Sequence, residues 1–289
     1  MKEPIFNGVC TALVTPFLGG RVNYPMMEQL LARQIESGIT TVVLAGTTGE
    51  APTLTDGEKL ELFRRAKEFT GDACTIIAGT GSNDTAHAIS LSIAAEDCGA
   101  DALLLVSPYY NKANNDGLIA HYTAIAQQVT LPVVLYNVPS RTGLDIPVSV
   151  YKALSEIPNI AGVKEASSSI TKITQIRNAC PKNFSVWSGN DDQAVPVISL
   201  GGQGLISVMS NVMPVETAAM VDAALDGDFD TAAALQADLQ TLCELLFSEV
   251  NPIPVKAAMK YIGYDCGSCR LPLGSLSEEN RVKMRNFFS

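Results

Sequence analysis

The sequence predicts an α/β protein, a (β/α)8 barrel with a C-terminal helical extension. Three observations indicate this fold class. Eight short apolar runs recur ~20–35 residues apart, which is the size of a βα unit. The runs are apolar almost throughout rather than alternating, as in parallel strands that are buried on both faces. The length of 289 residues also suits one α/β barrel with an extension.

The eight apolar runs are predicted to be the barrel strands. In chain order they are Val9–Val14, Thr41–Ala45, Cys74–Ala78, Ala102–Val106, Pro132–Tyr136, Ile160–Lys164, Phe184–Ser188 and Gly204–Ser207. An open, doubly wound parallel sheet is the alternative. It is less favoured because no Gly-x-Gly-x-x-Gly turn follows the first run.

Helix-start signals stand between the runs. Thr55 and Glu58 are spaced as a capping box in front of a helix. Asn83-Asp84, Asp116-Gly117 and Asp191-Asp192 are expected to begin three further helices, and Pro147 suits a first helical turn. The predicted helices are Lys59–Phe69, Thr85–Cys98, Leu118–Gln128 and Gln193–Leu200.

After Pro214 the alternation of strands and helices stops. The remaining pattern predicts helices over Val215–Ala224, Asp230–Val250, Pro254–Ile262 and Ser277–Phe288. Only the first of these is needed to close a barrel. We therefore expect the barrel to span residues 1–225 and a helical region packed on it to span residues 226–289.

Composition excludes several classes of protein. The net charge of −10 argues against a nucleic-acid partner, which needs clustered Lys and Arg. With 47% hydrophobic residues the chain is too apolar for disorder, yet it has no uncharged apolar run of ~18 residues that would cross a membrane. The two histidines, His87 and His121, leave little material for a metal site.

The cysteines favour a reducing compartment. Their number, seven, is odd and most lie in apolar surroundings, so we expect free thiols and a cytoplasmic protein. Cys266 and Cys269 form one isolated Cys-x-x-Cys, followed by Pro272. Without a second pair or a strand–helix context, we expect two ordinary loop cysteines. A redox-sensitive pair is the alternative.

Lys164 is the strongest single candidate for catalysis. Active sites of such barrels lie at the carboxyl ends of the strands, and Lys164 ends the apolar run Ile160–Lys164. Burial removes the hydration of the amine, and a neutral lysine amine is a nucleophile that condenses with a ketone or aldehyde. The alternatives are a buried salt bridge, for instance to Glu165, and a strand-end lysine that reaches solvent.

Hydroxyl groups are predicted to surround this lysine. Tyr136 ends the preceding strand, so its phenol would stand beside Lys164 and could relay protons. Its alternative role is that of a core aromatic. Thr47, Thr48 and Tyr110 add hydroxyls from other strand ends.

Two further segments could bind anions at the same end. Thr47-Thr48-Gly49 offers hydroxyls and backbone N–H groups to a carboxylate or phosphate, or is only a tight turn. Arg141 lies in a loop on the catalytic side, where a guanidinium could bind a carboxylate in bidentate fashion. Structural or solvent-facing roles are the alternative for Arg141.

Together these residues resemble a known family. The segments are Gly46-Thr47-Thr48-Gly49-Glu50, Tyr136-Asn137-Val138-Pro139-Ser140-Arg141-Thr142-Gly143 and Val163-Lys164-Glu165-Ala166. In order and spacing they resemble the signatures of the pyruvate-dependent class I aldolases, the family of dihydrodipicolinate synthase and N-acetylneuraminate lyase. Asn251–Lys256 and Arg270–Leu273 are similar to this family too, so the resemblance covers essentially the whole chain.

The resemblance implies an imine between Lys164 and pyruvate, with no metal or organic cofactor. It implies a proton relay of Tyr136, Thr48 and Tyr110, with Tyr110 contributed across a tight dimer interface of a homotetramer. Thr47 and Thr48 would hold the pyruvate carboxylate.

The resemblance also indicates the second substrate. Gly189 and Ile206 would line the pocket through their backbones. Arg141, within Pro-Ser-Arg-Thr-Gly, points to the synthases of lysine and diaminopimelate biosynthesis, where it would bind the carboxylate of L-aspartate 4-semialdehyde. An N-acetylneuraminate lyase or another sugar-acid aldolase is the alternative.

Feedback-inhibited members of this family bind lysine near the dimer interface. The corresponding positions here are Ala51, Asp56, Lys59, Asn83, His87 and Tyr109. Sensitive bacterial members tend to carry His in place of Lys59 and Glu in place of His87. Lys59, and a protonated His87, would repel the ammonium group of the effector. We therefore expect weak or absent inhibition by L-lysine. The alternative is that these are ordinary surface residues.

Overall fold

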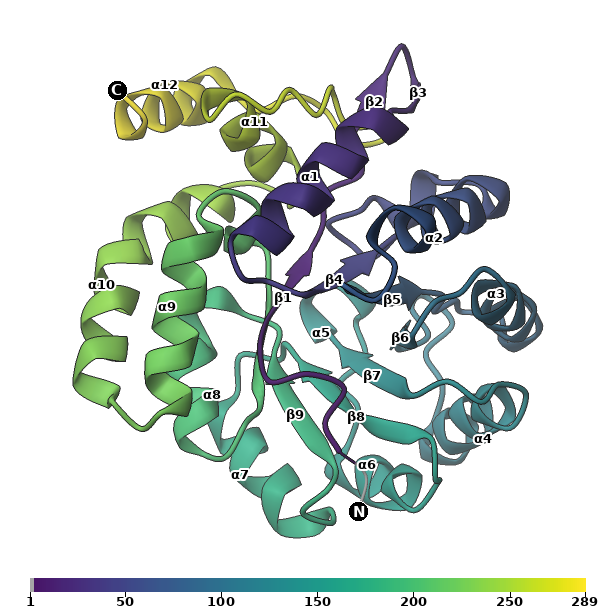
Figure 1. Cartoon of the computed structure of the whole chain (residues 1–289). Helices are drawn as coiled ribbons and strands as arrows, with labels where there is room; N and C mark the ends of the chain where they lie inside the picture. The colour runs from purple at the N-terminus through teal and green to yellow at the C-terminus, as the bar shows by residue number, and fades with distance from the viewer. Residues whose placement is uncertain (1–2) are drawn as a thin grey trace.

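A computed structural model describes residues 3–289 of the chain. Its centre is a closed barrel of eight parallel strands, in which each strand pairs with its neighbour along the chain and β10 returns to β1 (Figure 1). The strands are β1 (Gly8–Ala12), β4 (Thr41–Leu44), β5 (Thr75–Gly79), β6 (Ala102–Val106), β7 (Val133–Asn137), β8 (Ile160–Glu165), β9 (Ser185–Ser188) and β10 (Gly204–Ser207). The predicted (β/α)8 barrel is confirmed, and every predicted run overlaps one strand.

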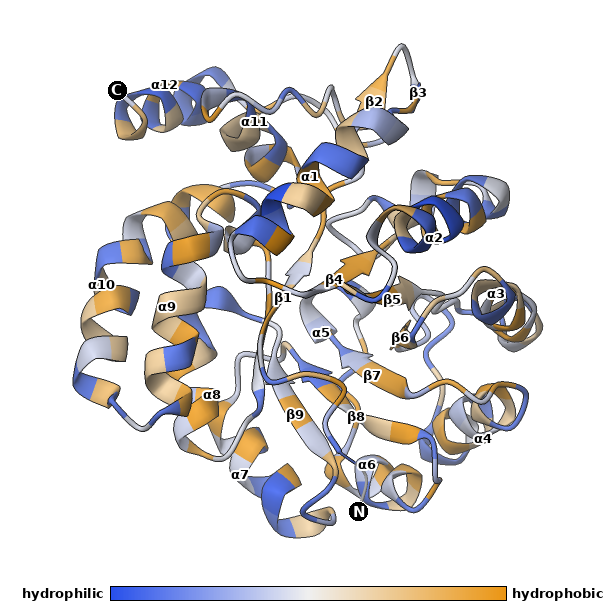
Figure 2. Cartoon of the chain, in the orientation of Figure 1, coloured by the Kyte–Doolittle hydropathy of each residue, from blue (hydrophilic) through white to orange (hydrophobic). Residues whose placement is uncertain are grey.

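Side chains of each strand alternate between the barrel interior and the layer beneath the helices. In β7, Val134 and Tyr136 pack inside the barrel with Trp187 and Ile206. Leu135, between them, belongs to the much larger core outside the barrel wall. Figure 2 shows the resulting hydrophobic strands at the centre of the molecule. This alternation decides which residues at the strand ends can face a substrate.

Helices surround the barrel (Figure 1). They are α1 (Tyr24–Glu36), α2 (Asp56–Thr70), α3 (Thr85–Asp97), α4 (Asn115–Ala126), α5 (Pro139–Thr142), α6 (Val148–Ser155), α7 (Ile170–Ala179), α8 (Ala194–Ser199) and α9 (Pro214–Leu225). α1 and α7 were not predicted from the sequence. Both have capping signals, because the side chains of Asn23 and Ser169 accept hydrogen bonds from backbone N–H groups of the first turn.

Some predicted helix starts hold and others are wrong. The Thr55–Glu58 capping box is present, and Asp84 caps α3. The start assigned to Asp116-Gly117 is wrong, because Asn114 is the cap and accepts a hydrogen bond of 2.9 Å from the Gly117 N–H. Asp191 begins a short 3-10 turn, η2 (Asp191–Gln193), instead of capping a helix.

The C-terminal part of the chain adds α10 (Phe229–Leu246), α11 (Ile253–Tyr261) and α12 (Glu278–Phe287). In Figure 1, α10 lies along α9, and α11 and α12 follow it, in contact with α10 and with each other. A hairpin of β2 (Phe17–Leu18) and β3 (Arg21–Val22), which was not predicted, meets this region. There the Phe17 N–H donates to the Cys266 carbonyl over 2.9 Å. The C-terminal region is therefore held against the mouth of the barrel.

Candidate active site

Lys164 and Tyr136 lie side by side at the carboxyl ends of β8 and β7. The strand register pairs Tyr136 with Lys164, and the Lys164 Nζ lies 4.5 Å from the centroid of the Tyr136 ring. Lys164 is only 5% exposed. Within residues 3–289 it has no ion-pair partner, and the carboxylate of Glu165 bonds to other groups. The amine is thus buried beside a phenol, as the sequence predicts. The alternative prediction, a buried salt bridge between Lys164 and Glu165, is wrong.

Gly189 leaves room for the lysine. A Cβ atom at this position would lie 2.7 Å from the Ala166 Cβ and 3.2 Å from the Lys164 Cε. Such contacts are too short, so only glycine lets the aliphatic stem of Lys164 lie here unshifted. Ile206, on β10, is fully buried and packs inside the barrel.

Thr47 and Thr48 lie in the turn after β4. Thr48 is buried, and its Oγ1 accepts a hydrogen bond of 2.9 Å from the Asn251 Nδ2. The turn is held from below by Thr15, whose hydroxyl donates to the Gly49 carbonyl over 2.7 Å. These contacts fix the two hydroxyl-bearing residues at the rim of the barrel.

Arg141 projects from α5, a four-residue helix where the sequence led us to expect a loop. The guanidinium is exposed, and its Nη2 donates to the Asn251 carbonyl over 3.2 Å. Asn251 therefore contacts both Thr48 and Arg141. The sequence analysis placed Asn251 in a segment that is similar to the family but assigned it no role in the site, because its contacts depend on how the C-terminal region folds back.

Ion pairs attach the C-terminal region to the turn after β4. Lys256 donates to Glu50 over 2.8 Å, and both side chains are almost completely buried. The backbone N–H of Arg270 donates to the other oxygen of Glu50 over 2.8 Å. The Arg270 guanidinium also binds Glu58 on α2, and this contact, against the effect of partial burial, lowers the pKa of Glu58 to about 2.

A cavity of about 650 Å³ opens at this end of the barrel. Its lining includes Thr47, Tyr136 and Arg141 of the predicted active site. It also includes every predicted effector-site residue: Ala51, Asp56, Lys59, Asn83, His87 and Tyr109. Lys164, Thr48, Gly189 and Ile206 are not part of its lining. One continuous cavity of the single chain thus joins two groups of residues to which the sequence assigned different roles.

The comparisons with known proteins agree with this geometry. A sequence model of the Dihydrodipicolinate synthetase family matches residues 5–289. The chain belongs to this family. It is 47% identical over 280 residues to 4-hydroxy-tetrahydrodipicolinate synthase of Acetivibrio thermocellus, covering 97% of this chain and 95% of that protein. It is 43% identical over 287 residues to the synthase of Thermoanaerobacter pseudethanolicus, covering 99% and 97% of the two chains.

Solved structures give the same result. The crystal structure of dihydrodipicolinate synthase from Aquifex aeolicus superimposes with a TM-score of 0.96 at 40% identity, over 98% of this chain and 97% of that one. The lysine-bound enzyme from Cyanidioschyzon merolae superimposes with a TM-score of 0.95 at 39% identity, over 98% and 97%. As a family member, the chain is an enzyme of the lyase class with a class I aldolase fold.

Two of the predicted effector-site residues, Lys59 and His87, contact a third, Asp56. The His87 Nε2 lies 2.8 Å from Asp56, and the Lys59 Nζ lies 3.5 Å from the same carboxylate. Burial opposes ionisation of Asp56, but the contacts with His87 and Lys59 outweigh it and lower the pKa of Asp56. On the other side, the Asn83 Nδ2 donates to the Tyr109 carbonyl over 3.2 Å. The Asp56 carboxylate is thus already paired with His87 and Lys59.

Tyr110, which the sequence assigns to the proton relay, is not part of the cavity lining among the described residues. It lies in the loop after β6 with a positive φ of 71°, and it is 92% exposed. Tyr109, its neighbour, lines the cavity instead.

A metal site requires a cluster of ligand side chains, and a membrane helix requires a long apolar segment. In residues 3–289 no three His, Cys, Asp or Glu side chains cluster so that they could hold a metal ion. Over the same residues no helix combines the length and the hydrophobicity needed to cross a membrane.

All seven cysteines carry free thiols, and burial raises the pKa of Cys266 to about 12 and that of Cys269 to about 11. Burial therefore favours the protonated form of these two thiols.

Proposed function

We propose that this chain condenses pyruvate with L-aspartate 4-semialdehyde to form 4-hydroxy-tetrahydrodipicolinate, in lysine and diaminopimelate biosynthesis. One observation carries the proposal: the buried Lys164 amine, which pairs with no carboxylate of residues 3–289, lies 4.5 Å from the centroid of the Tyr136 ring. Its relatives at 43–47% identity bear the name of this synthase. The reaction needs no metal and no organic cofactor.

The first half of the mechanism forms an imine. The Lys164 amine attacks the ketone carbon of pyruvate and gives a carbinolamine. Tyr136 then delivers a proton to the carbinolamine oxygen, which leaves as water. Thr48 connects the phenol to the rest of the relay. Thr47 and Thr48 hold the pyruvate carboxylate through hydroxyl and backbone N–H groups.

The second half forms the carbon–carbon bond. The protonated imine withdraws electrons, so the pyruvate methyl group loses a proton and an enamine results. The enamine carbon attacks the aldehyde carbon of L-aspartate 4-semialdehyde, whose carboxylate is bound by Arg141. The amine of that substrate then displaces Lys164, which closes the ring and frees the enzyme.

A second protomer would complete the site. Tyr110 is assigned to the proton relay, yet it is 92% exposed at the surface of the single chain. A hydroxyl that is needed in the site but exposed in the monomer is accounted for if it enters the site of a neighbouring copy. We therefore propose a homotetramer built from two tight dimers. The free thiols support a cytoplasmic location.

Borohydride trapping tests the proposal. Pyruvate and borohydride should add a reduced pyruvate adduct to Lys164, located by mass mapping, and Lys164→Ala should abolish it. Addition of L-aspartate 4-semialdehyde to the untreated enzyme should then consume both substrates. An adduct on another lysine would overturn the mechanism. Turnover of a sugar acid in place of the semialdehyde would favour the aldolase alternative, which the comparisons do not favour.

A further inference from the structure

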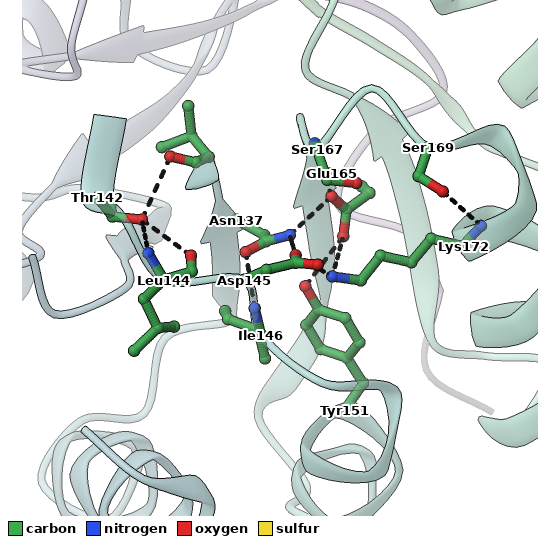
Figure 3. Close-up of polar contacts among 11 residues, drawn as sticks. Asn137, Thr142, Leu144, Asp145, Ile146, Tyr151, Glu165, Ser167, Ser169 and Lys172 are labelled. Atoms are coloured by element: carbon green, nitrogen blue, oxygen red, sulfur yellow. Dashed lines mark hydrogen bonds and ion pairs between the residues drawn. The ribbon is translucent and has the colours of Figure 1, made fainter. Parts of the chain in front are cut away.

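Asn137 and Glu165 directly follow Tyr136 and Lys164 on β7 and β8. The register pairs Asn137 with Glu165, one position beyond the Tyr136–Lys164 pair. Because strand side chains alternate, these two residues turn away from the barrel interior. Figure 3 shows them meeting outside the barrel wall, next to Tyr151 of α6.

Glu165 lies at the centre of a buried polar network. Its carboxylate accepts hydrogen bonds from the Asn137 Nδ2 (2.8 Å), the Tyr151 hydroxyl (3.0 Å) and the Ser167 N–H (2.8 Å). The Lys172 Nζ lies 3.9 Å away and also pairs with Asp145. Burial and the charge of Glu165 raise the pKa of Tyr151, which therefore stays a hydrogen-bond donor. The carboxylate is fully satisfied although it is 3% exposed.

Asn137 ties this network to both strands. Its Nδ2 donates to Asp145 (2.7 Å) as well as to Glu165, and its Oδ1 accepts from the Ile146 N–H (3.0 Å). Its backbone carbonyl accepts the Ala166 N–H over 2.9 Å. Side chain and backbone of one residue thus hold the end of β8 against the end of β7.

The strand pair needs such a link because its register is irregular. Val133 pairs with Ile160, but the next residue, Val134, pairs with Gly162. A register shift of one residue exchanges the two faces of a strand. Such a shift would turn Lys164 out of the barrel interior, so the register must be fixed again beyond the irregularity.

We propose that Asn137 and Glu165 are positioning residues for imine formation. Their hydrogen bond fixes the register of β7 and β8 at the active-site end, and so holds the Lys164 amine beside the Tyr136 ring. This inference rests on the proposed role of Lys164. Neither residue touches the substrate, and what matters is the location of the Glu165 oxygen atoms rather than their charge.

Two substitutions of Glu165 separate location from charge. Glu165→Gln removes the charge but keeps an oxygen that can accept from Asn137 and Ser167. Glu165→Asp keeps the charge but withdraws the oxygens by one methylene group. We expect the rate of borohydride-trapped imine formation to stay within about fivefold of wild type for Gln and to fall about 100-fold for Asp, because misplacement of a reacting group by ~1 Å has such an effect. A charge effect would give the reverse order and overturn the inference.

Asn137→Asp provides a second, independent measurement. The substitution replaces two donated hydrogen bonds by a carboxylate that faces Glu165 and Asp145. Trapping should be at least about 100-fold slower at pH 8. The difference in trapping rate between this variant and the wild type should become smaller as the pH falls, because protonation of the new carboxylate restores a hydrogen-bond donor toward Glu165 or Asp145. A deficit that is independent of pH, with an unchanged fold, would contradict the inference.

Asp101→Asn is the matched control. The Asp101 carboxylate also accepts a hydrogen bond from a strand, the Ile76 N–H of β5 (2.8 Å), and forms an ion pair with Lys67 (2.9 Å). These contacts lie at the opposite end of the barrel. The Asp101→Asn variant should trap pyruvate at the wild-type rate. Equal slowing in this variant would show a general loosening of the barrel and overturn the inference. If the wild type traps no pyruvate at Lys164, the proposed function fails instead.

Discussion

At the scale of single residues, the site depends on a lysine whose surroundings are built mostly by its neighbours. Gly189 leaves the space that the Lys164 stem occupies, and Tyr136 covers the amine. The sequence pointed to Lys164 and Tyr136 because both end apolar strands, and strand order makes such residues neighbours. It could not point to Asn251, whose contact with Thr48 depends on how the C-terminal region folds back.

Arg141→Ala should separate the two substrates. If the guanidinium binds the semialdehyde carboxylate, its loss removes charge-assisted hydrogen bonds that contribute ~1.5–3 kcal/mol, so kcat/KM for L-aspartate 4-semialdehyde should fall about 10–100-fold. Pyruvate trapping at Lys164 should remain near the wild-type rate. Steady-state kinetics with each substrate varied measures both effects, and an equal loss for the two substrates would contradict the assignment.

L-Lysine should inhibit weakly or not at all. Asp56 is already paired with His87 and Lys59, so this carboxylate is not free to bind the ammonium group of an effector. A coupled assay with increasing L-lysine checks this. Inhibition at submillimolar concentration would show that the prediction is wrong.

At the scale of elements, close packing at the strand ends should make the β9 turn intolerant of any side chain. Gly189→Ala would place a Cβ 2.7 Å from the Ala166 Cβ and 3.2 Å from the Lys164 Cε. Such overpacking typically costs ~1–3 kcal/mol of unfolding free energy. We expect that loss in urea unfolding together with slower pyruvate trapping, because the lysine must move. Gly57→Ala, which meets open space in the first turn of α2, should not lower the unfolding free energy and should leave pyruvate trapping unchanged.

The contact between α2 and the C-terminal segment should make stability depend on acid pH. Arg270 lowers the pKa of Glu58 from 4.5 to about 2, so the pair stabilises the fold above pH 4.5 and loses this effect as the pH falls toward 2. Because both side chains are partly solvated, we expect the pair to contribute only ~1 kcal/mol to the free energy of unfolding. Urea unfolding of Glu58→Gln should show a smaller loss between pH 6 and pH 3 than the wild type. An identical pH dependence would contradict this.

Elements were predicted with unequal success. The eight strands were found because continuous apolar runs mark parallel strands buried on both faces. Helix starts were less certain, since several Asn and Asp residues compete to be the cap, and Asn114 rather than Asp116 is the one that accepts a first-turn N–H. Asp191 is buried and accepts from Ser207 and Val208. Burial, opposed by these bonds, raises the pKa of Asp191, a tertiary role that a local pattern does not reveal.

At the scale of the whole molecule, the fold follows from the sequence, whereas the proposed site needs a hydroxyl, that of Tyr110, which is exposed on the single chain. The global charge of −10 says little about anionic substrates, because the guanidinium of Arg141 lines the cavity at the barrel mouth. The exposure of Tyr110 is the feature that a single-chain argument leaves unexplained. The proposed tight dimer accounts for this exposure, because it would bring Tyr110 to the site of the neighbouring copy.

Mixing two inactive variants tests that role. Lys164→Ala lacks the nucleophile but presents Tyr110, whereas Tyr110→Phe keeps Lys164 but lacks the donated hydroxyl. In a random mixture of tight dimers, half are hybrids with one intact site each, so about one quarter of wild-type activity should appear. The variants should be mixed after dissociation and reassembly. Failure to regain activity, with hybrids present by native mass spectrometry, would show that Tyr110 acts within its own chain.

The attachment of the C-terminal region has a consequence for protein synthesis. Asn251, Lys256 and Arg270 contact the turn that carries Thr47 and Thr48, yet the ribosome adds them more than two hundred residues later. During translation this turn therefore waits, with the Glu50 carboxylate unpartnered, until nearly the whole chain has emerged. A prematurely terminated product can therefore contain all eight barrel strands and still lack every one of these contacts with the turn.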